Sequence, residues 1–82
     1  MLAEVSLMTI SERLKALREE SENPLNQTQL GEKLHKSQKA ISRLETGESA
    51  MSVDDIIAYC LYYKVSADYI LGLPKDLNYP QK

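Results

Sequence analysis

Polar side chains with paired hydrogen-bonding groups gather on one side of a short segment near the middle of the chain. When residues 37–46 are wound as a helix, at about 100° per residue, Ala40, Ile41 and Leu44 share one side. The other side carries Gln38, Lys39, Ser42, Arg43 and Thr46. Glutamine can form two hydrogen bonds with adenine, and arginine or lysine can do so with guanine, in the major groove of DNA. The segment therefore has side chains suited to reading base edges.

Two short helices joined by a tight turn are expected to position these side chains. Ser37 is a good N-cap and Gly47 suits a left-handed residue at the end, so the segment is bounded as a helix on both sides. Asn26 and Gln29 have the spacing that begins a preceding helix. Gly31 inside that helix predicts that another helix backbone crosses close to it, because glycine there is otherwise unfavourable.

A helix is predicted before this pair and two are predicted after it. Thr9 and Glu12 have capping-box spacing at the start of the first helix, whose expected apolar stripe is Ile10, Leu14 and Leu17, with Arg13 on a solvated face. Ser52 begins the fourth helix. Its expected core stripe is Val53, Ile56, Ile57, Cys60 and Leu61.

The last helix is expected to begin at Ser66 and to close at Gly72, with Ala67, Ile70 and Leu71 as its apolar residues. The predicted fold is all-α, with five helices and a helix-turn-helix formed by the second and third. We expect a domain over residues 9–72, a flexible leader at 1–8 and a tail at 73–82.

Length and composition agree with one small domain. The chain has 82 residues, of which 43% are apolar, so it can bury one core. Its single cysteine cannot form an internal disulfide, and it has no apolar run long enough to span a membrane and no signal-peptide pattern. The expected location is cytoplasmic.

Charge is unevenly distributed. The net charge is −2, whereas proteins that bind nucleic acids usually have a basic excess. Residues 27–46 are locally basic, with Lys33, Lys36, Lys39 and Arg43 against Glu32 and Glu45. The distribution therefore allows this segment to face phosphate even though the whole chain is slightly acidic.

Other kinds of site have little support. His35 and Cys60 are the only histidine and cysteine, and they lack metal-ligand spacing. Neither the cysteine nor any serine has an evident base and orienting partner, so we expect no enzyme activity, no metal and no cofactor.

The segment QTQLGEKLHKSQKAISRLETGE resembles the helix-turn-helix of the Cro and lambda-repressor-like family, also called the XRE family of bacterial and phage regulators. The matching residues in order are Gln27, Leu30, Gly31, Leu34, Ser37-Gln38, Ile41-Ser42-Arg43, Glu45 and Gly47-Glu48. ERLKALREE and VSADYILG are similar to the family's flanking helices, so the resemblance covers about residues 10–72. It implies a transcriptional regulator, most often a repressor, that binds a palindromic operator as a homodimer, in a bacterial nucleoid or a phage-infected cell.

The resemblance also implies roles for single residues. Gln27 is expected to contact a phosphate, and the Ser37 hydroxyl can also donate to a phosphate. Gln38 is expected to read a base. The remaining polar positions of the recognition helix would divide between bases and phosphates: Lys39, Ser42, Arg43 and Thr46. Arg18 and Glu45 match a structural ion pair that is partly buried.

The turn and the loop that follows Gly47 both depart from the family pattern. The turn has His35 and Lys36 where glycine and an apolar residue are usual. His35 can adopt positive φ, and the lysine stem can cover an apolar gap. The loop residues Ser49, Ala50 and Met51 are neutral where the family often has cations, which predicts reduced affinity for phosphate.

Two interpretations of the C-terminal helices stay open. The tyrosines at 59, 62, 63 and 69 either pack at the edge of the core or form part of a dimer contact. Because family members commonly pair through the fifth helix, the dimer candidates are Tyr69, Ile70 and Leu73.

The alternative function is a protein-interaction module with the same fold, such as an antitoxin or antirepressor partner. Its basis is the negative net charge of the whole chain and the neutral loop at residues 49–51.

Overall fold

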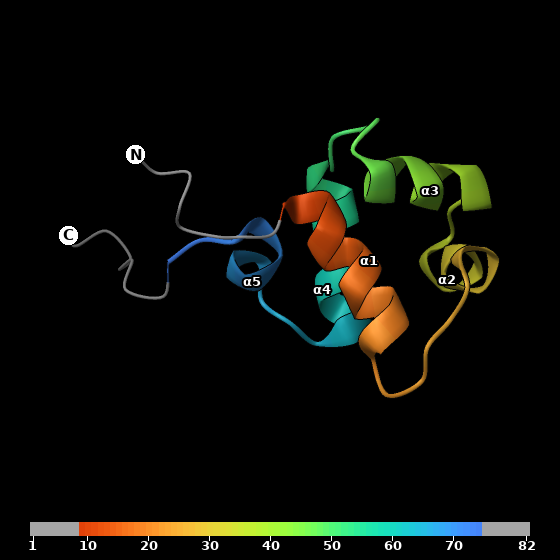
Figure 1. Cartoon of the computed structure of the whole chain (residues 1–82), viewed down its shortest axis with the longest axis horizontal. Coiled ribbons are helices and arrows are strands. Elements are labelled where there is room, and N and C mark those ends of the chain that lie inside the picture. The colour runs from red at the N-terminus through yellow and green to blue at the C-terminus, as the bar shows by residue number, and fades with distance from the viewer. Residues whose placement is uncertain (1–8, 75–82) are drawn as a thin grey trace.

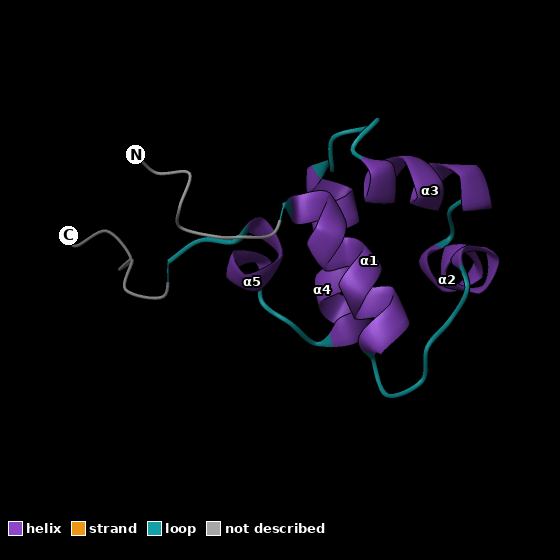
Figure 2. Ribbon diagram, in the orientation of Figure 1, coloured by secondary structure: helices purple, strands orange, loops and turns teal. Residues whose placement is uncertain are grey.

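Five helices run through residues 9–74, which are the part of the chain that the computed structural model describes. They are α1 (Ile10–Glu20), α2 (Gln27–Leu34), α3 (Gln38–Thr46), α4 (Val53–Tyr63) and α5 (Ala67–Leu71). These residues contain no strand, as Figure 2 shows, so the predicted all-α fold is confirmed. The expected leader at 1–8, and the expected tail from residue 75 onward, lie outside the described residues.

Local capping sets the helix starts. In α1 the Glu12 amide donates to the Thr9 hydroxyl over 3.1 Å, and the Glu12 carboxylate accepts from the Thr9 amide over 2.9 Å. Asn26 and Gln29 form the same reciprocal bonds at α2. Because each box satisfies amides that the first helical turn leaves free, these starts could be predicted from short-range spacing alone.

The core joins all five helices. Its buried members are Leu14, Leu30, Leu34, Ile41, Leu44, Tyr59 and Ile70. Figure 1 shows α2 and α3 at one end of the molecule and α5 at the other, with α1 and α4 between them. The core therefore holds α3 by its apolar side. Among the described helices, none is both long enough and apolar enough to cross a lipid bilayer.

The predicted core stripe of α4 is wrong for three of its five residues. Val53, Ile57 and Leu61 are exposed, by 71, 49 and 74% respectively. Ile56 and Cys60 are half-buried, and Cys60 packs against the core. The residues of α4 that are buried are Asp55 and Tyr59. Since apolar residues occur almost all round this helix, periodicity could not identify which side faces the core.

Two expectations for α1 are also wrong. Ile10 lies at the exposed end of its stripe, with 37% of its surface accessible. Arg13 is buried instead of solvated, and its guanidinium lies where a Cβ on Gly72 would be. Gly72 itself has φ +74°, so glycine there permits both the left-handed end of α5 and the close approach of the arginine.

The tyrosines divide between core and surface. Tyr59 is fully buried and stacks on Tyr63, with ring centroids 6.2 Å apart, whereas Tyr62 and Tyr69 are exposed. Among the dimer candidates, Tyr69 and Leu73 are exposed, but Ile70 is fully buried in the core. Ile70 is therefore excluded as a dimer contact, because its side chain already packs within its own domain.

Candidate nucleic-acid interface

The turn between α2 and α3 fixes the angle at which α3 leaves. His35 has φ 60° and ψ 44°, the left-handed conformation that its residue type tolerates, and its amide donates to the Gly31 carbonyl. The Lys36 amide donates to the same carbonyl over 2.7 Å. A Cβ on Gly31 would collide with the Lys36 carbonyl oxygen. The backbone close to Gly31 is thus this turn, and the expectation of a second crossing helix is wrong.

Lys36 ties the same turn to α4. Its ammonium forms an ion pair with the Asp55 carboxylate, and both side chains are largely shielded from solvent. Burial raises the pKa of the Asp55 carboxyl, but hydrogen bonds from Lys36 and from the Ser52 amide, with the charge of Lys36, outweigh it and hold that pKa below its usual value. Lys36 is therefore engaged within the protein, as is the carboxylate that caps α4.

The polar side of α3 faces solvent. Ile41 and Leu44 are buried, whereas Gln38, Lys39, Arg43 and Thr46 are exposed and Ser42 is half-buried. Ser37 is exposed, and its hydroxyl accepts from the Ala40 amide over 3.0 Å as the N-cap. The residues expected to read or contact DNA from α3 consequently share the side of the helix that the core leaves free.

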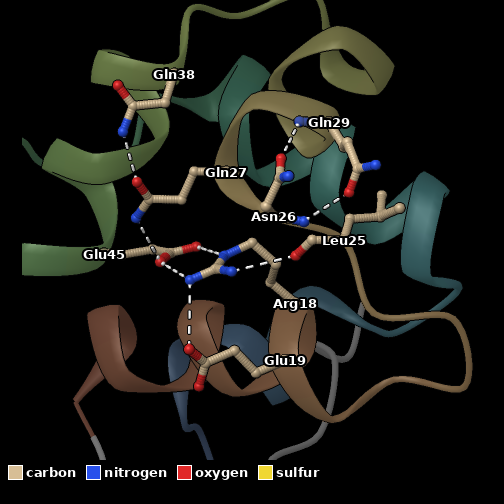
Figure 3. Close-up of polar contacts among 8 residues, drawn as sticks. All are labelled: Arg18, Glu19, Leu25, Asn26, Gln27, Gln29, Gln38 and Glu45. Carbon is tan, nitrogen blue, oxygen red and sulfur yellow. Dashed lines mark hydrogen bonds and ion pairs between the residues drawn. The ribbon is translucent and has the colours of Figure 1, made fainter.

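A chain of hydrogen bonds runs from this exposed side into the domain (Figure 3). The Gln38 amide nitrogen donates to the Gln27 amide oxygen over 2.6 Å. The Gln27 nitrogen donates in turn to Glu45 Oε1 over 3.1 Å. Sequence spacing did not reveal this relay, because its members are 11 and 18 residues apart and meet only when α2 packs on α3.

Arg18 of α1 anchors the inner end of the chain. Its Nε and Nη2 donate to the two oxygens of Glu45 over 2.7 and 2.8 Å, and its Nη1 donates to the Leu25 carbonyl over 3.1 Å. The Glu45 side chain is 2% exposed and that of Arg18 is 10% exposed. The hydrogen bonds to Glu45 raise the pKa of Arg18 against the opposing effect of burial, so the guanidinium stays charged. The two residues expected to pair are thus more deeply buried than the resemblance implied.

Two tyrosines near this ion pair, Tyr59 and Tyr63, have shifted pKa values. Burial raises the pKa of both phenols, to about 12 for Tyr63, and the negative charge of Glu45 adds to the effect. Both phenols are therefore neutral near pH 7.

The outer end of α3 is held more loosely. Arg43 Nε lies 3.9 Å from Glu48 Oε1, and both side chains are more than half exposed. The Thr46 hydroxyl donates to the Arg43 carbonyl over 3.3 Å. An exposed pair at this distance contributes at most about 1 kcal/mol, so the Arg43 guanidinium can turn towards another acceptor at low cost.

The arrangement combines a rigid helix with polar side chains directed outwards. Gln38 offers an amide whose orientation is fixed by Gln27, while Lys39 and Arg43 provide cations. Such a helix has the dimensions and the donor set to enter a DNA major groove.

Comparisons with known proteins agree with this geometry. Residues 14–70, more than half of the chain, match the family model described as helix-turn-helix. The structure is similar to the crystal structure of the P22 c2 repressor protein in complex with synthetic operator 9T, with a TM-score of 0.70 and 28% identity over 78% of this chain and 94% of that one. A comparison with curated protein sequences gave no match. The chain belongs to the helix-turn-helix family of Cro/lambda-repressor-like regulators.

Proposed function

We propose that this protein is a sequence-specific regulator of transcription that binds double-stranded DNA with α3 in the major groove. The observation that carries the proposal is the polar side of α3, which is exposed while the opposite side is locked into the core. The P22 c2 repressor was crystallised with operator DNA and shares both the fold and the helix-turn-helix, which supports the same kind of ligand here.

Gln38 is the proposed base reader. Its amide nitrogen already donates to Gln27, which leaves the amide oxygen and the second N–H of Gln38 for an adenine edge. Gln27 would position Gln38, and its own remaining N–H would be available to a phosphate. A base reader that is held in place before binding loses less side-chain entropy on complex formation.

The other exposed groups divide between base edges and phosphates. Arg43 is the proposed guanine or flanking-phosphate contact, and Lys39, Ser42 and Thr46 complete the reading side. The Ser37 hydroxyl accepts a bond as the N-cap but retains its own proton, which it can donate to a phosphate. Because Lys36 is engaged with Asp55 and residues 49–51 are neutral, few cations support these contacts, and we expect moderate affinity.

Repression of a palindromic operator by a homodimer is the form of this function that we favour. One short helix reads few base pairs, so two-fold proteins place two recognition helices about 34 Å apart to read a longer site. Tyr69 and Leu73 have exposed surface for such a pairing, whereas Ile70 has none.

Selection of bound duplexes from a random pool tests the proposal. The wild-type chain should enrich one palindromic motif, and its affinity should fall steeply with salt because phosphate contacts release counterions. Arg43→Ala should weaken binding by about 1–3 kcal/mol, whereas Lys15→Ala, which removes the same charge from the exposed surface of α1, should have little effect. Absence of any enriched motif would contradict the proposal.

A protein-interaction module is the second candidate, and the exposed apolar residues of α4 are the observation that favours it. In that case a pull-down should capture a protein partner with little dependence on salt, and Gln38→Ala should leave the capture unchanged. The regulator instead requires salt-sensitive DNA binding that depends on α3.

A further inference from the structure

Three of the five residues predicted to face the core from α4 form an exposed apolar row instead. Val53, Ile57 and Leu61, here called the α4 row, follow one another at intervals of four residues and are 71, 49 and 74% exposed. Asp55 and Tyr59 lie on the opposite side of the helix and are buried. α4 packs on α2 and α5, and no part of residues 9–74 covers the row. A contiguous row of large apolar side chains is typical of an interaction surface.

Opposite charges stand at the two ends of this row. Asp54 is exposed in the first turn of α4, and Lys64 is exposed at its C-cap. Neither forms an ion pair with another described residue. They are ten residues apart, which corresponds to about 15 Å along a helix, so they cannot pair with each other within one chain.

We propose that the α4 row binds a second copy of this chain, with the two α4 helices antiparallel about a two-fold axis midway between Ile57 and Leu61, so that Ile57 packs on the partner's Leu61. A homodimer that uses one patch twice must be two-fold symmetric. A parallel arrangement would place like charges together at both ends of the row. The antiparallel arrangement places Asp54 near the partner's Lys64 twice, and it also opposes the helix dipoles favourably.

The size of the row sets the strength of the contact. An eleven-residue helix is about 16 Å long, so two α4 helices bury less than the roughly 800 Å² per partner of a standard interface. We expect a dissociation constant of about 0.1 mM for the free protein, and DNA with two adjacent half-sites would strengthen the pairing by raising the effective concentration. The inference rests on the homodimer of the proposed function and places its surface on the α4 row instead of at Tyr69 and Leu73.

Sedimentation equilibrium of the full chain without DNA, up to about 1 mM, tests the surface. Wild type should dimerise, and Ile57→Lys should weaken the dimer at least tenfold because it places a cation against the partner's apolar Leu61 on both sides of the two-fold axis. Tyr69→Lys is the matched control, since Tyr69 is also 49% exposed but lies on α5, and it should leave the dimer unchanged. Circular dichroism should show native helix content in both variants.

Charge reversal tests the antiparallel register. Asp54→Lys and Lys64→Asp should each weaken the dimer about tenfold, because each replaces two attractive contacts by two repulsive ones. The double variant should return to within about twofold of wild type, because it restores both pairs. Aspartate also tolerates the left-handed conformation of Lys64, for which φ is 57°.

Three results would overturn the inference. They are a monomer at the highest concentration, dissociation by Tyr69→Lys but not by Ile57→Lys, and a double variant no tighter than the single ones. The inference would also be overturned if the wild type is a monomer and Ile57→Lys lowers its free energy of unfolding. That result would show that another segment of the same chain covers the row. If the protein is a monomer but still enriches a DNA motif, the α4 surface is wrong and the proposed DNA-binding function is unaffected. If the protein dimerises through α4 but enriches no motif, the proposed DNA-binding function is wrong and the α4 surface is unaffected.

Discussion

The two ion pairs that involve α3 differ in almost every physical respect. Glu45, on the inner side, accepts two short hydrogen bonds from Arg18 and is shielded from solvent. Arg43, on the outer side, lies 3.9 Å from Glu48 in a pair that is more than half exposed. A buried pair is costly to break, because the remaining charge is left without a partner, whereas an exposed pair contributes little.

This difference separates two roles: the inner pair stabilises the fold, whereas the outer pair lies on the side of α3 that is proposed to read DNA. The inner pair connects α1 to α3 and, through Gln27, orients Gln38. The outer pair leaves Arg43 able to exchange its partner for a phosphate or a base. Substitutions on the inner side should therefore lower the free energy of unfolding, and those on the outer side should change DNA binding alone.

The largest effect is expected from Glu45→Ala. It leaves the Arg18 guanidinium buried with only the Leu25 carbonyl and the weaker Glu19 contact, and it removes the acceptor of Gln27. The free energy of unfolding, measured by urea denaturation, should fall by about 3–5 kcal/mol. Glu48→Ala should change it by less than about 0.5 kcal/mol. Equal losses for the two variants would contradict the distinction between the pairs.

Gly31→Ala should rank next. The added methyl group meets the Lys36 carbonyl oxygen, which belongs to the backbone and cannot rotate away, so the turn that orients α3 must shift. We expect a loss of about 2 kcal/mol in urea denaturation, after the gain in helix propensity is included. Gly47→Ala meets only a serine side chain at 3.4 Å and should cost about 1 kcal/mol through its positive φ. A stabilised Gly31→Ala protein would show that the turn is not tightly packed.

The pH dependence should identify the contribution of Asp55. Because its pKa is lowered in the folded protein, the stabilisation is present above the ordinary aspartate pKa of 3.8 and is lost as the pH falls through the folded value. Asp55→Asn should cost about 1–2 kcal/mol near pH 7, with the difference from wild type shrinking below about pH 4. Urea denaturation between pH 3 and 7 measures this, and a constant difference would contradict the assignment.

Glu48→Gln should produce the smallest effect. Removing this carboxylate frees Arg43 and should tighten binding to the selected DNA about twofold, without a change in stability. Glu20→Gln makes the same change of charge on the exposed surface of α1 and is the control. If fluorescence anisotropy shows equal gains for both, net charge alone explains them.

Local interactions account for what the sequence could predict of the fold. The Thr9 and Asn26 capping boxes and the left-handed residues His35 and Gly47 depend only on neighbours within a few positions. Residue type and spacing were therefore sufficient to place these helix boundaries.

Long-range contacts account for what could not be predicted. The apolar residues of α4 gave no reason to prefer the side with Asp55 and Tyr59, because the cation that pairs with the buried Asp55 carboxylate is Lys36, 19 positions away. The burial of Arg13 against Gly72 has the same origin, since α1 and α5 meet only in the folded domain. Within the candidate site, the polar side of α3 followed from periodicity, whereas the link from Gln38 through Gln27 to Glu45 required the packed helices.

The preference at each base pair, compared between wild type and Gln38→Ala by selection from one random DNA pool, is the most direct measurement of reading by α3. We predict that Gln38→Ala loses the preference at one position in each half-site, keeps it elsewhere and binds about 1–3 kcal/mol more weakly. An unchanged motif with unchanged affinity would contradict the assignment of α3 as the helix that reads DNA.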